Sequence, residues 1–118
     1  MYDVITAGSA TVDVFAKTRF SELIKIIDTK GETDLLAFPS GSKILIDELE
    51  FTTGGGGTTT AVALSRLGHK VGFLGKLGEG TNSDFIHKNL VKEKIDLLCA
   101  HGKGNAGYSI ILDTLEHD

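Results

Sequence analysis

Four consecutive glycines at residues 54–57 lead into a segment with helical periodicity, and this junction constrains the fold more than any other feature. Glycine lacks a Cβ atom, so a ligand can approach the main chain closely there. The helical pattern extends to Leu67, and Gly68 behind it is a typical helix terminator. The start of such a helix offers backbone N–H groups and a positive dipole end. Because four glycines lose backbone entropy on folding, we favour a loop that holds an anion or a polyhydroxyl ligand over a flexible turn without a ligand.

Apolar runs on both sides of the glycine loop predict alternating strands and helices. Strands are expected at residues 4–7, 11–16, 71–74, 95–100 and 108–112, and helices at residues 61–67 and 81–92. Strands that alternate with helices are typical of βαβ units and of a largely parallel sheet. The expected fold class is therefore α/β.

The segment between the second strand and the glycines has a different character. Residues 18–34 are polar and compatible with a short helix or a strand, and residues 30–32 read as a turn. Residues 35–46 predict a strand, a turn and a second strand, with the turn at residues 39–42. This hairpin is expected to form a small β-flap apart from the main sheet.

Composition and charge limit the classes of function. The 118 residues are 41% hydrophobic and 24% charged, as expected for one compact globular domain. The net charge is −4 and no basic stripe occurs, so neither nucleic acid nor an anionic membrane is an expected partner. The single Cys99 forms no internal disulfide. The sequence shows no secretory signal and no apolar run of about 20 residues, so we expect a soluble cytoplasmic protein.

Other chemical motifs are weak or absent. No window fits the P-loop pattern that binds nucleoside triphosphates. One G-x-G-x-x-G occurs at residues 102–107, but it precedes a strand instead of joining a strand to a helix, so we interpret it as a surface loop. The histidines are His69, His87, His101 and His117. They lack the spacing of metal ligands, so we interpret them as surface or packing residues and predict no metal site.

Asp13 differs from the other acidic residues because it lies in the strand expected at residues 11–16. Alternation along that strand places it on the face opposite Val12 and Val14. A carboxylate near the strand ends of an α/β sheet can face the crevice in which such folds bind ligands. Its oxygens accept hydrogen bonds, which suits the vicinal hydroxyl groups of a sugar. A solvated strand residue without a ligand is the alternative interpretation.

Separated segments of the chain, taken in their order, resemble the ribokinase-like (PfkB) family of sugar kinases. Residues 54–68, followed by residues 71–78, resemble the first signature of that family. Gly8 and the Thr-Val-Asp of residues 11–13 resemble its opening strand and its sugar-binding aspartate. Residues 105–112 resemble the later strand that closes over the substrate. The order and spacing of these segments match along nearly all of the chain.

This resemblance implies a ribokinase-like three-layer sandwich with a mostly parallel sheet and a small β-lid. Residues 1–118 would form a truncated, amino-terminal part of that domain, with the lid inserted at about residues 18–53. The resemblance further implies transfer of the γ-phosphoryl group of ATP to a hydroxymethyl group of a sugar or nucleoside. Such enzymes work mainly through positioning and charge stabilisation. The lid strands of the family often pair between subunits, which implies a homodimer.

The same resemblance implies a set of site residues. Sugar hydroxyls would be held by Asp13, Gly55, Gly56, Gly57 and Thr59. ATP and Mg²⁺ are implied for the complete enzyme, and neither is expected to bind to this chain. The catalytic base of the family belongs to a Gly-Ala-Gly-Asp segment, which does not occur in these 118 residues. The base is therefore expected beyond Asp118, and the chain alone is expected to be inactive.

The chain departs from the family pattern at two places. Thr59 stands where the family usually has asparagine, so one hydroxyl replaces an amide that both donates and accepts. Residues 78–83 lack the aspartate and the final glycine of a Gly-x-Asp-x-x-Gly pattern, and they receive no site assignment. Two other functions are compatible with the residues. One is a small non-catalytic α/β module that binds a sugar or nucleotide. The other is a dinucleotide-binding oxidoreductase domain, which needs G-x-G-x-x-G between a strand and a helix, a context that residues 102–107 do not provide.

Overall fold

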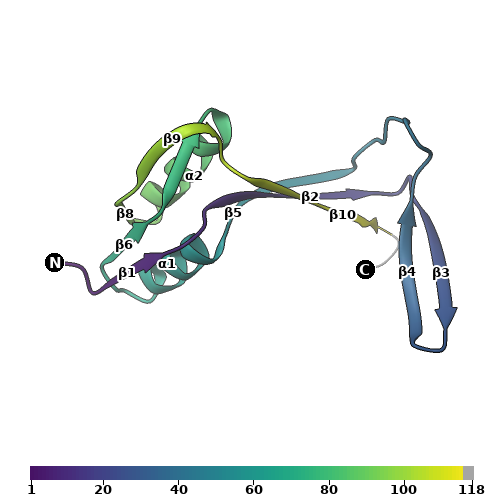
Figure 1. The fold of residues 1–118 in the computed structure, drawn as a ribbon, viewed down its shortest axis with the longest axis horizontal. Coiled ribbons are helices and arrows are strands. Elements are labelled where there is room, and N and C mark those ends of the chain that lie inside the picture. The colour runs from purple at the N-terminus through teal and green to yellow at the C-terminus, as the bar shows by residue number, and fades with distance from the viewer. Residues whose placement is uncertain (116–118) are drawn as a thin grey trace. The chain divides into compact units, whose positions relative to one another are not determined.

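The computed structural model describes residues 1–115, which form ten strands and two helices (Figure 1). In chain order they are β1 (Val4–Ala7), β2 (Thr11–Thr18), β3 (Glu22–Asp28), β4 (Gly31–Ala37), β5 (Glu48–Gly54), α1 (Gly56–Arg66), β6 (Val71–Leu74), β7 (Lys76–Glu79), α2 (Thr81–Lys92), β8 (Asp96–Leu97), β9 (Ala100–Asn105) and β10 (Tyr108–Thr114). The chain divides into two compact units. Unit 1 contains residues 1–14 and 51–109, and the described part of unit 2 contains residues 15–50 and 110–115.

A parallel sheet with the strand order β1-β6-β8 forms the centre of unit 1. Val4 of β1 pairs with Val71 of β6, and Gly72 of β6 pairs with Asp96 of β8. Helix α1 precedes β6 and helix α2 precedes β8, which is how parallel neighbours are usually connected. The predicted α/β class and the parallel sheet are confirmed.

The core of unit 1 lies where α1 and α2 pack against this sheet. Ala61, Phe73, Ile86 and Leu90 are each 0% exposed. Ile86 and Leu90 are four positions apart on α2, so they lie on one face of the helix. The helix predicted at residues 81–92 is confirmed at both ends.

Glycine residues set both ends of α1. Gly55 is the N-cap residue with φ of 101°, and the helix begins at Gly56 rather than at residue 61 as predicted. After Arg66, Gly68 adopts φ of 96° and donates its N–H to the Ser65 carbonyl at 3.0 Å. The prediction that Gly68 ends this helix is confirmed.

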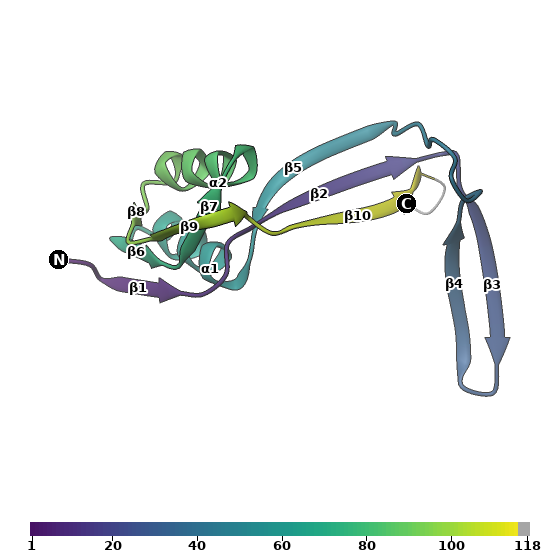
Figure 2. The ribbon, with the colours of Figure 1, turned by 45° about the horizontal axis from the view of Figure 1, so that its top comes forward.

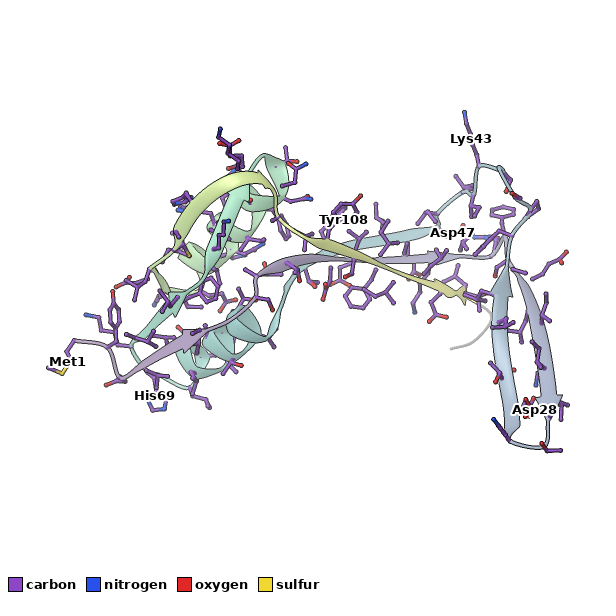
Figure 3. The ribbon with its side chains drawn as sticks, in the orientation of Figure 1. Met1, Asp28, Lys43, Asp47, His69 and Tyr108 are labelled. Atoms are coloured by element: carbon purple, nitrogen blue, oxygen red, sulfur yellow. The ribbon has the colours of Figure 1, made fainter. Side chains whose placement is uncertain are left out.

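An antiparallel hairpin of β3 and β4 belongs to unit 2, and its strands run side by side in both ribbon views (Figure 2). Glu22 pairs with Ala37, and Asp28 pairs with Gly31. Asp28 lies at the tip of the hairpin (Figure 3), where its Oδ1 accepts the N–H of Lys30 at 2.7 Å. Gly31 has φ of 136°, which is a conformation that favours glycine in this turn.

The hairpin predicted around residues 39–42 is wrong. Residues 38–47 contain no strand, and the turn of the observed hairpin lies at residues 29–30. The partner of β4 is β3, which is rich in isoleucine. β-branched side chains pack well on a pleated surface. β3 therefore pairs with β4, in the place predicted for residues 43–46.

The segment after β4 is fixed by side-chain contacts within unit 2. Thr18 donates its hydroxyl to the Leu45 carbonyl at 2.7 Å. Arg19 donates its backbone N–H to Asp47 Oδ2 at 2.9 Å and its Nε to Oδ1 at 3.1 Å. Asp47 donates its N–H to the Lys17 carbonyl at 2.8 Å. These bonds join residues 45 and 47, which lie outside any strand, to the end of β2 and to the residue after it.

The surface loop predicted at residues 102–107 is also wrong. Most of this segment is strand β9, which pairs in parallel with β7. A Cβ atom on Gly78 would collide with the carbonyl oxygen of Gly104, so the two strands need glycine for their close approach. The strand predicted at residues 95–100 is shorter than expected, because β8 contains only two residues.

A further sheet has the strand order β10-β2-β5, and its strands contribute residues to both units. The strands predicted at residues 11–16 and 108–112 are confirmed, and each extends by two residues at its end.

Neither helix in the described part of the chain is long and apolar enough to cross a membrane.

An ion pair links α1 to the residue that follows α2. Arg66 donates from Nε to Glu93 Oε2 at 2.9 Å and from Nη2 to Oε1 at 2.5 Å. The hydrogen bonds from this guanidinium hold the pKa of Glu93 below its ordinary value. A lowered pKa in the folded state stabilises the fold above the ordinary carboxyl range. That stabilisation is lost as the pH falls through the folded-state pKa.

We expect Arg66→Gln to raise the pKa of Glu93 and to lower the urea midpoint slightly at pH 7. The loss is small because the Arg66 side chain is 69% exposed, and it vanishes in acid, where Glu93 is protonated in both proteins. NMR titration of the Glu93 carboxyl and urea unfolding at both pH values measure these effects. Lys25→Gln removes the Lys25–Glu32 pair of unit 2 and serves as the control. An unchanged Glu93 pKa in Arg66→Gln would contradict the assignment.

Candidate functional site

Asp13 on β2 packs against Gly54, the last residue of β5. A Cβ atom at position 54 would lie 2.6 Å from Cγ of Asp13, so only glycine leaves room for this carboxylate. Asp13 is half-buried, and no hydrogen bond or ion pair of its carboxylate is found among residues 1–115. Polar groups that are withdrawn from water normally find a partner in the protein. An oriented carboxylate without one is available to a ligand.

Two other glycines of the loop have separate structural causes. Gly55 has φ of 101°, and a Cβ atom there would lie 2.7 Å from the carbonyl carbon of Ser9. Gly57 is buried. A Cβ atom on Gly57 would lie 2.7 Å from Cε2 of Phe73 and 2.9 Å from the carbonyl carbon of Gly8. Internal packing therefore requires glycine at both positions.

Gly56 is the exception within residues 54–57. No atom lies within 4 Å of the place that a Cβ atom would take there, and the residue is exposed. Four glycines predict a ligand-binding loop, but internal packing explains three of them. Only at Gly56 does the missing side chain leave open space for a ligand.

Most N–H groups at the start of α1 already have acceptors. Gly56 donates its N–H to Ser9 Oγ at 3.2 Å, and Thr58 donates its N–H to the Ser9 carbonyl at 3.4 Å. Thr59 donates its N–H to the Gly55 carbonyl at 2.9 Å. The expectation of free N–H groups is therefore wrong for Gly56 and Thr58, whereas the Thr59 bond is the first ordinary bond of the helix. An anion would find few donors here, whereas a ligand that itself donates hydroxyl hydrogen atoms fits the site better.

The two threonines after the glycines differ in their surroundings. Thr58 is fully buried and donates its hydroxyl to the Gly54 carbonyl at 2.5 Å, which joins the end of β5 to the first turn of α1. Thr59 is exposed at the helix start. The structure thus brings Asp13 next to the glycine loop, with Gly56 and Thr59 accessible to solvent.

Ser9 and Thr58 support the site, and the sequence analysis missed both. Thr58 is not among the predicted site residues, because the predicted helix begins at residue 61 and its first turn then lacks this threonine. A threonine in the first turn of a helix can donate its hydroxyl to a carbonyl three or four residues earlier, so the threonines after the glycines are a local signal for this contact. The bond from Gly56 to Ser9 joins residues 47 positions apart, so only the tertiary fold shows it.

A separate cavity of about 320 Å³ lies between β5, α1 and α2. Arg66, Asn89 and Lys92 are among its polar lining residues, and neither Asp13 nor the glycine loop contributes to it. The Arg66 guanidinium is already bonded to Glu93. This cavity is therefore distinct from the candidate site.

The other reactive side chains of residues 1–115 do not assemble into a cluster of metal-binding groups. Burial raises the pKa of the Cys99 thiol, which disfavours the nucleophilic thiolate. His69, His87 and His101 are exposed, as predicted, and His69 points outward just after α1 (Figure 3). His117 lies outside the described residues. Within residues 1–115, no three side chains of the metal-binding types come together.

Comparison with known proteins shows which family the chain matches and which solved structures have a similar fold. A family model for the pfkB family of carbohydrate kinases matches residues 21–115. Ribokinase from Giardia lamblia is 18% identical with a TM-score of 0.72, and the match covers 100% of this chain and 34% of that one. Phosphofructokinase-2 from Escherichia coli in complex with potassium is 17% identical with a TM-score of 0.67, covering 95% and 31%. A PfkB protein from Polaromonas sp. JS666 is 22% identical with a TM-score of 0.64, covering 95% and 31%.

The fold is thus that of the ribokinase-like α/β proteins. The chain belongs to the pfkB family of carbohydrate kinases, because the family match includes most of its residues. It spans about a third of the length of these solved structures. The family match includes the glycine loop but begins after Asp13. The case for Asp13 as a site residue therefore rests on its geometry.

Proposed function

We propose that this chain is the sugar-binding and lid-bearing part of a kinase that phosphorylates the hydroxymethyl group of a sugar or nucleoside. The observation that carries the proposal is the Asp13 carboxylate, which packs against Gly54 of the glycine loop and lacks a partner among residues 1–115. In the same loop Gly56 is exposed, with open space where a Cβ atom would lie. Family membership supports a carbohydrate as the substrate class. A cytoplasmic location agrees with the single cysteine of the chain.

Each candidate site residue has a role that follows from its chemistry. The two oxygens of Asp13 accept hydrogen bonds from adjacent hydroxyl groups of the sugar. Gly56 lets the sugar ring approach the main chain, and Thr59 offers one exposed hydroxyl that donates or accepts. Gly55 and Gly57 act through the backbone, because both are required by the packing of the loop. These residues would orient a neutral polyol. In phosphoryl transfer, positioning of the substrate is one of the two main sources of rate enhancement, together with charge stabilisation.

The described residues do not fit ATP or Mg²⁺. Among residues 1–115 no acidic cluster forms a metal site, and the N–H groups of Gly56, Thr58 and Thr59 are bonded internally. No step of phosphoryl transfer is therefore derived for these residues. We propose that the ATP site and the catalytic base lie outside this chain, and that the chain alone transfers no phosphoryl group. Appreciable ADP formation with any sugar in a turnover assay would contradict this.

Isothermal titration calorimetry tests the proposed ligand class. We expect binding of at least one of ribose, fructose and adenosine, and none of NAD. Binding of NAD without any sugar would support the oxidoreductase alternative instead. A kinase and a simple binding module both bind sugar, so the coding sequence beyond the codon of Asp118 separates them. A reading frame that leads to Gly-Ala-Gly-Asp supports the kinase, and an immediate stop codon supports the module.

We also propose that the chain forms a homodimer through its lid strands. The hairpin of β3 and β4 carries Ile24, Ile26 and Leu35 on one face, since Ile24 stands opposite Leu35 and residues two apart point the same way. Their side chains are 47%, 47% and 42% exposed. Burial of such a face against a second copy would remove apolar surface from water.

We expect Ile26→Lys to convert this dimer into a monomer, because two lysine charges would be buried in the contact. Light scattering of the chain at high concentration measures the mass. Thr29→Lys, which adds the same charge in the turn of the hairpin, is the matched control and should leave the dimer intact. A wild-type protein that is monomeric at every concentration would contradict the proposal.

A further inference from the structure

We propose that Ser9, in the connection between β1 and β2, is a positioning residue that holds the glycine loop against Asp13. The inference rests on the proposed sugar site, because Ser9 acts on that site through its neighbours. It assigns Ser9 no contact with the sugar. Ser9 instead fixes the backbone on which the ligand would bind.

Ser9 contacts the loop through both of its oxygen atoms. Its Oγ accepts the N–H of Gly56 at 3.2 Å, and its carbonyl accepts the N–H of Thr58 at 3.4 Å. The same carbonyl group fills the space that a Cβ atom of Gly55 would need, with its carbon 2.7 Å from that place. One residue thus restrains three positions of the turn that enters α1.

The connection that carries Ser9 leads directly into β2, where Asp13 lies four positions after Ser9. Gly8 anchors it by donating its N–H to the Leu74 carbonyl of β6 at 3.2 Å. Asp13 packs against Gly54, and Ser9 packs against Gly55. Ser9 and Asp13, at the two ends of residues 9–13, therefore fix the position of the glycine loop relative to the Asp13 carboxylate.

Ser9 also sets the ligand chemistry of the loop. Because its Oγ occupies the N–H of Gly56, that donor is not available to a phosphate or carboxylate. The accessible side-chain groups that remain are the Asp13 carboxylate, which accepts hydrogen bonds from hydroxyl groups, and the exposed Thr59 hydroxyl, which donates or accepts. Removal of the Ser9 hydroxyl should therefore weaken sugar binding and at the same time expose a donor to anions.

Amide hydrogen exchange measured by NMR on the whole chain tests the contact without a ligand. Ser9→Ala should raise the exchange rate of the Gly56 amide by about threefold to tenfold, as expected for the loss of one hydrogen bond. Ser9→Thr keeps the hydroxyl and should restore the wild-type rate. Ser42→Ala, which removes an exposed serine bonded to the Pro39 carbonyl at 2.7 Å, is the control. Equal exchange at Gly56 in the wild type and Ser9→Ala would overturn the proposal.

Titrations of the same proteins with ribose, fructose, adenosine and inorganic phosphate test the consequence. Ser9→Ala should weaken binding of whichever sugar or nucleoside the wild type binds by about threefold to tenfold, and Ser9→Thr should restore it. Phosphate should shift the Gly56 amide signal only in Ser9→Ala. Unchanged sugar affinity in Ser9→Ala, or a phosphate-induced shift in the wild type, would overturn the proposal. A wild type that binds none of the three ligands would contradict the proposed function, and Gly56 exchange would then decide the role of Ser9 by itself.

Discussion

Asp13→Asn is expected to weaken sugar binding by about a hundredfold, because two charge-assisted hydrogen bonds of about 1.5 kcal/mol each are weakened or lost. The amide keeps the shape of the carboxylate but has one acceptor oxygen instead of two. The wild-type carboxylate has no hydrogen-bond or ion-pair partner among residues 1–115, and asparagine keeps its shape against Gly54, so the replacement breaks no internal hydrogen bond. The thermal midpoint should therefore stay close to that of the wild type. Calorimetric titration and thermal unfolding measure the two effects.

Asp28→Asn provides the matched control for this experiment. Asp28 is an exposed aspartate at the tip of the β3–β4 hairpin, where it accepts the N–H of Lys30. Its replacement should leave sugar affinity unchanged. Similar losses of affinity in Asp13→Asn and Asp28→Asn would show that a general charge effect is measured. An unchanged affinity in Asp13→Asn would remove Asp13 from the site.

Gly57→Ala is expected to lower the free energy of unfolding by about 3 kcal/mol and the thermal midpoint by about 10 °C. The added Cβ atom would lie 2.7 Å from the ring of Phe73, which is 0% exposed, and 2.9 Å from the backbone of Gly8. Neither neighbour can move without disturbing the core of unit 1. For a chain of this size such a loss is a large part of the total stability.

Gly56→Ala separates packing from ligand binding in the same loop. Its Cβ atom meets nothing within 4 Å, and alanine is the better helix former, so the stability should stay equal or rise by up to about 1 kcal/mol. The added methyl group should nevertheless hinder the approach of a sugar. A Gly57→Ala protein that melts within about 2 °C of the wild type would contradict the packing account of the loop.

The parallel core was predictable from the sequence because its signals are local. Helix α2 has apolar residues such as Ile86 and Leu90 at helical spacing, and β6 is a short buried run. The hairpin of unit 2 was not predictable in the same way. Both residues 22–28 and residues 43–46 are apolar enough to pair with β4, and the choice between them depends on packing along the whole strand.

The candidate site shows the same division between local and distant information. The glycine run marked the loop, and alternation along β2 singled out Asp13. The reason for glycine at residues 54, 55 and 57 is a contact with a residue distant in the chain, such as Asp13 against Gly54 or Phe73 against Gly57. Without these contacts the four glycines look alike, although only Gly56 is free of internal packing.

Mapping of a sugar onto the backbone amides by NMR tests the central claim most directly. The uniformly ¹⁵N-labelled chain is titrated with ribose, fructose and adenosine in turn, and the amide shifts are followed residue by residue. We predict that the shifts of the ligand that binds gather around Asp13 and residues 54–59. Shifts confined to other parts of the chain, or no shift with any of the three ligands, would contradict the assignment of a sugar site to Asp13 and the glycine loop.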